Sequence, residues 1–156
     1  MEDTKFSEKI LHWQLKTFDE LSNLDIYEVL RLRAEVFVVE QNAAYQDVDK
    51  IDIGSHHLLG MHHDQLVTYC RIIPPGQYFT EACLGRVVTR EKYRKQGFSR
   101  KAVFLALQAI QNLYNTSECR ISAQEYLIDF YTSFGFEVVS ERYLEDGLPH
   151  FQMLKS

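Results

Sequence analysis

The chain has 156 residues, a length typical of one domain, and its 46% hydrophobic and 25% charged residues are typical of a soluble globular protein. A net charge of −5 argues against nonspecific nucleic-acid binding, and three cysteines without C-x-x-C spacing indicate neither a disulfide framework nor a zinc site. No apolar run could span a bilayer and the N-terminus has no secretory signal pattern, so we expect a cytoplasmic protein away from membranes.

The first elements are a strand and two helical segments. Residues 11–15 alternate apolar and polar side chains, which predicts a strand. Residues 17–20 have the form of a capping box and predict a short helical segment. Apolar residues then recur at helical spacing from about Asp25 to Val38, which predicts a second helix with Arg31 and Arg33 on its polar side.

A loop follows the second helix. Periodicity is lost from Glu40 to Ser55, and we expect this loop to shape a pocket. Its acids Asp47, Asp49 and Asp52 could attract a cation, but they lack the glycine and terminal glutamate of a calcium loop. We therefore expect no metal site.

Sheet character dominates the rest of the chain. Residues 57–61 and 66–73 predict a β-hairpin. The further predicted elements are a strand at 84–89, a helix at 98–115, a strand at 119–123, a helix at 125–133 capped by Gly135, a strand from 136 to 140, and a last strand at 151–154. This order predicts an α/β fold of mixed α+β type, in which helices cover both faces of a mixed sheet.

A basic segment lies where the strand at 84–89 leads into the helix at 98–115. Six Lys or Arg residues lie between Arg90 and Lys101, against one acid, Glu91. Unpaired amides at a helix start favour a bound phosphate, and Gly97 lets the backbone approach it closely. Taken alone, the segment is more typical of a solvated basic helix start. It matches neither the P-loop nor the dinucleotide-binding motif.

Two motifs in this region point to a family. Arg94-x-x-Gly97-x-Ser99 resembles the acetyl-coenzyme A signature R/Q-x-x-G-x-G/A of the GCN5-related N-acetyltransferases, with Ser99 where that family prefers Gly or Ala. Residues 130–136, Phe-Tyr-Thr-Ser-Phe-Gly-Phe, are similar to the F-Y-x-x-x-G-F element of the same family.

The match extends to the ElaA-like branch and covers nearly the whole chain. The segments that resemble this branch are 33–42, 45–47, 57–60 and 143–150. The branch commonly has Cys-Pro where this chain has Ala43-Ala44, so a thiol has no role there.

The resemblance implies a single N-acetyltransferase domain over residues 1–156 with the acyl-coenzyme A acyltransferase fold, a mostly antiparallel mixed sheet flanked by helices. It implies acetyl-coenzyme A as cosubstrate, with the pantetheine arm held by the backbone of Val87, Val88 and Thr89. The backbone amides of Lys95, Gln96, Gly97, Phe98 and Ser99 would hold the pyrophosphate. The side chains of Arg94 and Lys95 would add positive charge there, or else lie in solvent. Gln124 would bond to the coenzyme's amide groups, or else lie exposed at a helix start.

For the chemistry, the resemblance places the Tyr131 hydroxyl beside the coenzyme sulfur as general acid. A tyrosine pKa of about 10 keeps this hydroxyl protonated at pH 7. Residue pattern alone favours packing of Tyr131 against Phe130 and Phe134. A lysine-like amine is neutral only about once in a thousand near neutral pH, so a base is needed.

The candidate bases are Glu40, His57, Asp146 and His150, of which Glu40 and His150 are expected to face one cleft. The acceptor would be a small amine, an amino acid, or a peptide or protein amine, with no nucleic-acid or membrane partner. Whether two copies form a homodimer stays open. The alternatives are a non-catalytic acyl-coenzyme A binding or sensing module and, with less support, an interaction domain without a ligand.

Overall fold

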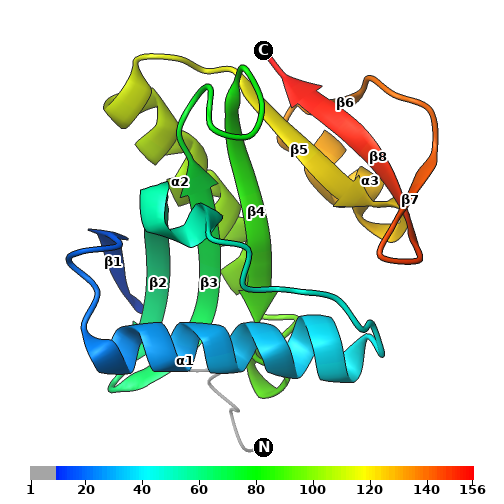
Figure 1. The fold of residues 1–156 in the computed structure, drawn as a ribbon. Helices are drawn as coiled ribbons and strands as arrows, with labels where there is room; N and C mark the ends of the chain where they lie inside the picture. Colours follow the sequence, from blue (N-terminus) through cyan, green and yellow to red (C-terminus); the bar gives the residue numbers. More distant parts are fainter. Residues whose placement is uncertain (1–9) are drawn as a thin grey trace, which may run out of the picture.

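A computed structural model describes residues 10–156 and contains one mixed sheet of eight strands. The strand order is β1-β2-β3-β4-β5-β8-β6, with β7 also paired to β8 (Figure 1). Every pairing is antiparallel except that of β4 with β5. The strands are β1 (His12–Thr17), β2 (His56–His62), β3 (Gln65–Ile73), β4 (Ala82–Thr89), β5 (Cys119–Gln124), β6 (Glu137–Val138), β7 (Tyr143–Glu145) and β8 (Leu148–Lys155).

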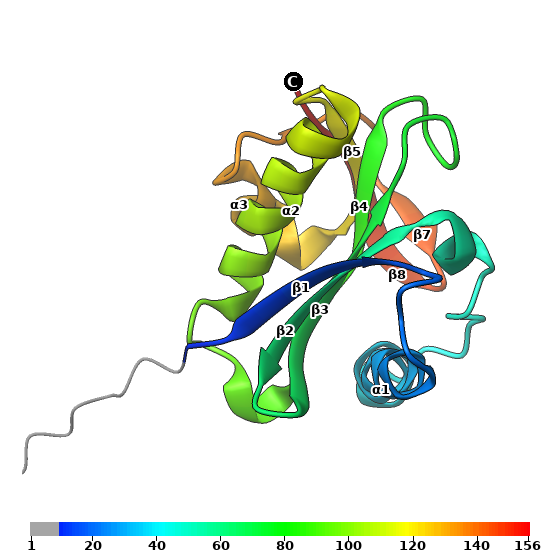
Figure 2. The same cartoon turned by 90° about the vertical axis from the view of Figure 1, so that its left-hand side faces the viewer.

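Helices cover both faces of this sheet, as predicted (Figure 2). The helical elements are α1 (Asn23–Arg33), the π-helix η1 (Ala34–Glu40) that continues it, η2 (Ile51–Gly54), η3 (Glu91–Tyr93), α2 (Phe98–Tyr114), η4 (Glu125–Leu127) and α3 (Ile128–Thr132). Helix α1 lies on one face of the sheet, and α2 and α3 lie on the other. No helix within residues 10–156 has the length and apolar character needed to cross a bilayer.

The core consists of two main apolar layers separated by the sheet. Helix α2 buries Ala102, Val103, Ala106 and Ile110 against one face, together with Cys70 and Ile72 of β3. The other layer packs Val29 and Leu32 of α1 against Leu66 and Tyr69 of the same strand. Because β3 is buried on both faces, its sequence is an almost continuous apolar run.

The helical segment predicted at residues 17–20 does not form. Thr17 and Glu20 do make the reciprocal bonds of a capping box, at 3.0 and 3.3 Å, but these bonds close a turn after β1. A second capping box, between Ser22 and Asp25, starts α1 instead. The turn places Phe18 and Leu21 in the layer beneath α1, and burial of these apolar side chains stabilises it.

The strand predicted from residue 136 is shorter than expected. Only Glu137 and Val138 pair with β8 as β6, and the chain then leaves the sheet before returning as β7. Residue pairing with a distant strand, rather than local pattern, sets these limits.

Candidate functional site

Strands β4 and β5 separate soon after they begin. They pair only at Ala82 with Cys119 and at Cys83 with Arg120, and then diverge (Figure 1). From Leu84 onward, the described pairings of β4 are with β3 alone. The backbone groups on its other side therefore form an open sheet edge, which can bind an extended ligand as an additional strand.

A bulge lies on this open stretch of β4. Val88 pairs with Tyr69 and Gly85 pairs with Arg71, so β4 has one more residue than β3 between these pairs. Arg86 adopts a left-handed conformation there, with φ of 53°. Such a bulge bends the strand and redirects its side chains, which accords with the divergence from β5.

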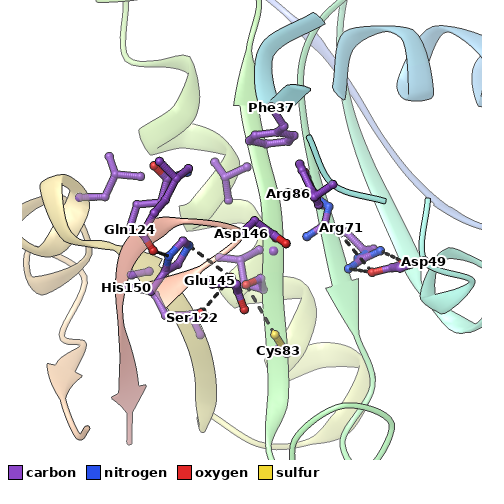
Figure 3. A pocket seen from close by; sticks show the side chains of 18 of the residues that line it. Phe37, Asp49, Arg71, Cys83, Arg86, Ser122, Gln124, Glu145, Asp146 and His150 are labelled. Atoms are coloured by element: carbon purple, nitrogen blue, oxygen red, sulfur yellow. Dashed lines mark hydrogen bonds and ion pairs between the residues drawn. The ribbon is translucent and has the colours of Figure 1, made fainter. Parts of the chain in front are cut away.

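A cavity of about 390 Å³ lies in the opening between β4 and β5 (Figure 3). Arg86 on β4 and Gln124 on β5 lie on opposite walls, and residues of the β7–β8 hairpin complete one side. The loop that follows η1 contributes Gln41, Ala43, Tyr45, Gln46, Asp49 and Ile51. This loop therefore shapes a pocket, as the sequence predicts.

Tyr131 lines this cavity and is only 7% exposed. Its ring packs edge-on against Phe130 and Phe136, with ring centres 5.1 and 5.8 Å apart. Burial raises the pKa of the Tyr131 hydroxyl above its ordinary value, so the group stays protonated. Tyr131 thus both packs against aromatic neighbours and lines the cavity.

A second cavity, of about 200 Å³, lies over the loop before α2. Gly97 caps the helix with φ of 81°, and a Cβ placed on it would meet no atom within 4 Å. No side chain caps this helix, so its first amides point into open space, where an anion can bind. The residues of the predicted pyrophosphate site that line the cavity are Arg94, Lys95, Gly97, Phe98 and Ser99, together with Thr89 of the predicted pantetheine site.

Three other predicted coenzyme-binding residues lie in three different environments. Gln96 is exposed and lines neither cavity, whereas Val88 is buried in the layer beneath α1. Any contact of Val88 with a ligand in the opening is therefore through its backbone. Gln124 lines the larger cavity, and its Nε2 lies 3.3 Å from Oε1 of Gln41.

Ser99, the departure from the family pattern, is held by a chain of hydroxyl groups. Its Oγ lies 2.6 Å from Thr89 Oγ1, which lies 3.0 Å from Thr68 Oγ1. Thr68 donates to the Val88 carbonyl. The Ser99 hydroxyl therefore points toward Thr89 on β4.

The candidate bases lie in three different environments. His57 is in the interior, with Nδ1 2.7 Å from the Tyr69 hydroxyl and Nε2 2.9 Å from the Asp52 carbonyl, and burial lowers its pKa. Glu40 lines neither cavity and forms a two-point ion pair with Arg94, whose hydrogen bonds lower the Glu40 pKa. His150 and Asp146 both line the larger cavity. The expectation that Glu40 and His150 share a cleft does not match these positions.

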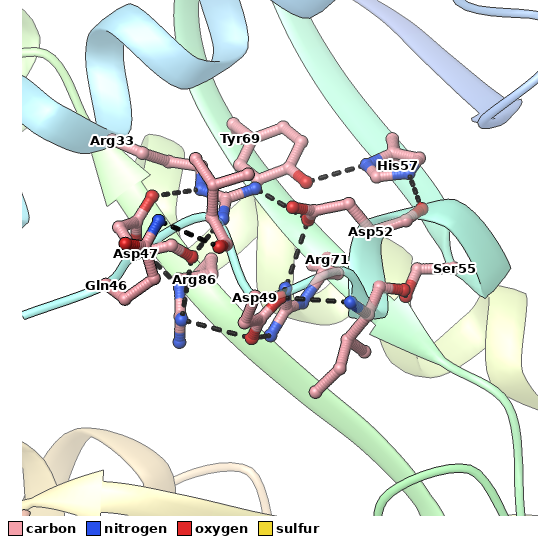
Figure 4. Close-up of polar contacts among 12 residues, drawn as sticks. Arg33, Gln46, Asp47, Asp49, Asp52, Ser55, His57, Tyr69, Arg71 and Arg86 are labelled. Atoms are coloured by element: carbon pink, nitrogen blue, oxygen red, sulfur yellow. Dashed lines mark hydrogen bonds and ion pairs between the residues drawn. The ribbon is translucent and has the colours of Figure 1, made fainter.

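The loop acids are held by arginines (Figure 4). Arg33 contacts Asp47 at 2.9 Å and Asp52 at 2.7 Å, and Arg71 contacts Asp49 and Asp52 at 2.8 and 3.0 Å. Arg86 pairs with Asp47 at 2.8 Å. We call these six residues the Arg–Asp cluster; it fastens the loop over β3 and β4.

The position of Arg33 corrects the sequence-based prediction. Its side chain is fully buried, whereas the helical pattern places it on the polar side with Arg31. Two carboxylates far along the chain compensate its charge, and a periodicity argument assumes that no such partners exist. Among residues 10–156 no group of three or more His, Cys, Asp or Glu side chains could hold a metal ion.

Sequence reasoning did not identify Glu145 or Ser122, which line the larger cavity beside His150. Glu145 Oε2 lies 3.2 Å from His150 Nε2 and accepts a hydrogen bond from Ser122 at 3.3 Å. The sequence Glu145-Asp146-Gly147 is typical of a hairpin turn and was a usable signal for Glu145, because a hairpin brings residues on either side of its turn together.

Comparison with known proteins identifies the family. A family model described as an acetyltransferase (GNAT) domain matches residues 19–156. A UPF0039 protein of Synechocystis is 39% identical, covering 92% of this chain and 94% of its own. The crystal structure of Escherichia coli ElaA is 36% identical with a TM-score of 0.88, covering 94% of this chain and 99% of its own. An acyl-CoA N-acyltransferase structure from Pseudomonas aeruginosa is 38% identical with a TM-score of 0.90, at the same coverage.

Proposed function

Because this chain belongs to the GNAT acetyltransferase family, in its ElaA-like branch, we propose that it transfers the acetyl group of acetyl-coenzyme A to an amine acceptor. Acyl transfer from coenzyme A is the chemistry of the family. The acetyl donor, the amine acceptor and direct attack within a ternary complex are our proposal. Residues 1–156 would act as a single domain.

The observation that supports this function most strongly is that a helix start and a buried tyrosine both lie along the open edge of β4. The helix start at Gly97 and Phe98 lies at one end of this edge, and the buried Tyr131 lines the cavity between β4 and β5. Amides at the helix start fit a pyrophosphate. The side of β4 from Val87 to Thr89 that no strand pairs fits an extended arm with amide groups. The two cavities provide space for both parts.

Each residue has a distinct role in the proposed reaction. An amide of the β4 edge polarises the acetyl carbonyl, since a fixed N–H stabilises the oxyanion that forms there. Tyr131 donates its proton to the departing thiolate, and its raised pKa keeps that proton available. His150 or Asp146, rather than Glu40, lies at the cavity where the acceptor's proton must be taken.

A thiol-release assay with acetyl-coenzyme A and a panel of amines tests this proposal. Coenzyme binding measured by calorimetry, together with thiol release that depends on an amine, is the expected result. Coenzyme binding without thiol release for any amine would favour the alternative, a non-catalytic acyl-coenzyme A binding or sensing module. Absence of coenzyme binding would contradict both readings.

A further inference from the structure

Four polar side chains form a chain of hydrogen bonds beside the larger cavity, and three of them, Ser122, Glu145 and His150, line it. The Tyr143 hydroxyl lies 2.5 Å from Ser122 Oγ, and Ser122 donates to Glu145 at 3.3 Å. Glu145 Oε2 lies 3.2 Å from Nε2 of His150 (Figure 3). Three strands, β5, β7 and β8, hold these groups in register, since Tyr143 pairs with His150 and Ser122 with Gln152.

The direction of each bond follows from what its partner can do. Nδ1 of His150 lies 2.8 Å from the Leu148 carbonyl, which can only accept, so Nδ1 carries a hydrogen. Ser122 donates to Glu145, so its oxygen accepts from Tyr143. A neutral His150 then has a lone pair on Nε2, facing a carboxylate oxygen that is also an acceptor. A proton must lie between them for a favourable contact.

An alkylammonium group can supply that proton. It carries three donors and a positive charge, which suit an imidazole lone pair and a carboxylate side by side. Both partners line the cavity, and the Glu145 side chain is 40% exposed, so the site can be reached. We propose that Glu145 and His150 together bind the ammonium group of the acceptor and that His150 Nε2 takes its proton. This inference rests on the proposed function.

The other charges at the cavity favour the same acceptor class. On one wall Arg71 and Arg86 are paired with Asp49 and Asp47 of the Arg–Asp cluster. On the other wall lie Asp146 and Glu145, of which Glu145 is paired with the one histidine, His150. The excess charge of that wall is negative, so a primary alkylammonium is favoured over an acidic acceptor.

The protons balance as follows. The ammonium nitrogen loses one proton to His150 Nε2, and its lone pair then forms a bond to the thioester carbon. As the carbon–sulfur bond breaks, Tyr131 gives its proton to the thiolate sulfur. The second proton lost from nitrogen returns to Tyr131 through solvent, and His150 releases its proton to solvent. One amide, one thiol and one free proton result.

The test uses the full chain loaded with coenzyme A and n-butylamine as the probe at pH 7.5. Side-chain nitrogen NMR of the histidines should show an amine-dependent change at His150 in the wild type, and Glu145→Gln should abolish it. With acetyl-coenzyme A, Glu145→Gln should lower kcat/KM for the amine at least 100-fold, the usual size of an acid–base contribution. Coenzyme affinity should stay within twofold, which verifies the fold.

Two further variants make the result specific. Glu141→Gln removes an exposed carboxylate four residues earlier that lines neither cavity, and it should behave as wild type. Glu145→Asp keeps the charge on a shorter side chain and should recover part of the lost kcat/KM.

The two proposals fail in different ways. No amine-dependent change at His150 in the wild type, or a change that persists in Glu145→Gln, would overturn the ammonium site. Absence of thiol release with every amine would overturn the proposed function, while the NMR measurement still decides whether Glu145 and His150 bind the amine.

Discussion

The carboxylate of Glu40 and the guanidinium of Arg94 form a two-point ion pair that joins the end of η1 to the loop before α2. The next residue, Gln41, contacts Gln124 of β5 at 3.3 Å, so the end of η1 contacts both sides of the opening between β4 and β5. Arg94 lines the cavity proposed for the pyrophosphate. A bound pyrophosphate and Glu40 would therefore compete for the same guanidinium.

Glu40→Gln is expected to strengthen coenzyme A binding by about two- to fivefold. In the wild type, coenzyme binding must break the ion pair between Glu40 and Arg94, and a partly exposed ion pair contributes about 0.4–1 kcal/mol. The variant binds coenzyme without this cost. Isothermal calorimetry at fixed low salt measures it. Glu35→Gln is the matched control, because Glu35 lies on the same helix and contacts Arg90 at 3.6 Å. A 100-fold loss of turnover with unchanged coenzyme affinity would instead identify Glu40 as the base.

Tyr131→Phe should reduce thiol release at least 100-fold and leave the Kd for coenzyme A within twofold, because only the donated proton is removed. Tyr27→Phe, an exposed tyrosine of α1, is the control. Since burial raises the pKa of Tyr131, its hydroxyl stays protonated at high pH. Deprotonation of Tyr131 should therefore cause no decrease in kcat at any pH up to about 9. Unchanged turnover in Tyr131→Phe would remove Tyr131 from the reaction.

The order of the elements could be predicted because the buried face of each strand or helix appears in the sequence as a periodic pattern of apolar residues. Alternation at residues 11–15 and helical spacing at 98–115 depend only on neighbours in sequence. The coenzyme loop was predictable for the same reason, since Arg94 to Ser99 form one contiguous motif. Residues 17–20 show the limit, because the same capping bonds can close a turn or start a helix.

The acceptor side of the cavity depends on contacts between distant residues. Arg86 and Asp47 are 39 residues apart, and Gln41 and Gln124 are 83 apart. Contacts between residues so far apart produce no periodic pattern in a single sequence, so they could not be predicted from it. The pattern therefore predicted that residues 40–55 shape a pocket, but not that their acids are neutralised by arginines from α1, β3 and β4.

Ser99→Ala should leave coenzyme A affinity within twofold, because the hydroxyl is already paired with Thr89 and a helix start binds phosphate through its backbone amides. It should lower the free energy of unfolding by about 0.5–1.5 kcal/mol, since Thr89 loses its partner at 2.6 Å. Urea unfolding and calorimetry measure the two effects. A tenfold loss of coenzyme affinity would show that the Ser99 hydroxyl itself contacts the ligand.

Arg33→Met should lower the free energy of unfolding by about 3–5 kcal/mol. Removing one member of a buried ion pair leaves the carboxylates of Asp47 and Asp52 without its charge. Arg31→Met is the matched control two residues earlier. Arg31 is exposed and 3.6 Å from Glu28, so its loss should change stability by less than about 0.5 kcal/mol. Equal effects of the two substitutions in urea unfolding would contradict a structural role for Arg33.

The difference in stability between wild type and Arg33→Met should depend on pH. Burial alone would raise the pKa of Asp52, but hydrogen bonds and charge from Arg33 and Arg71 outweigh it and hold that pKa below its ordinary value. A carboxyl group with a lowered pKa in the folded state stabilises the fold fully above its unfolded pKa, about 3.9, and less as pH falls further. Urea unfolding from pH 7 to 3 should show a constant difference down to about pH 5 and a shrinking one below about pH 4. A difference that is the same at pH 3 and pH 7 would mean that Arg33 stabilises the fold by packing rather than by its charge.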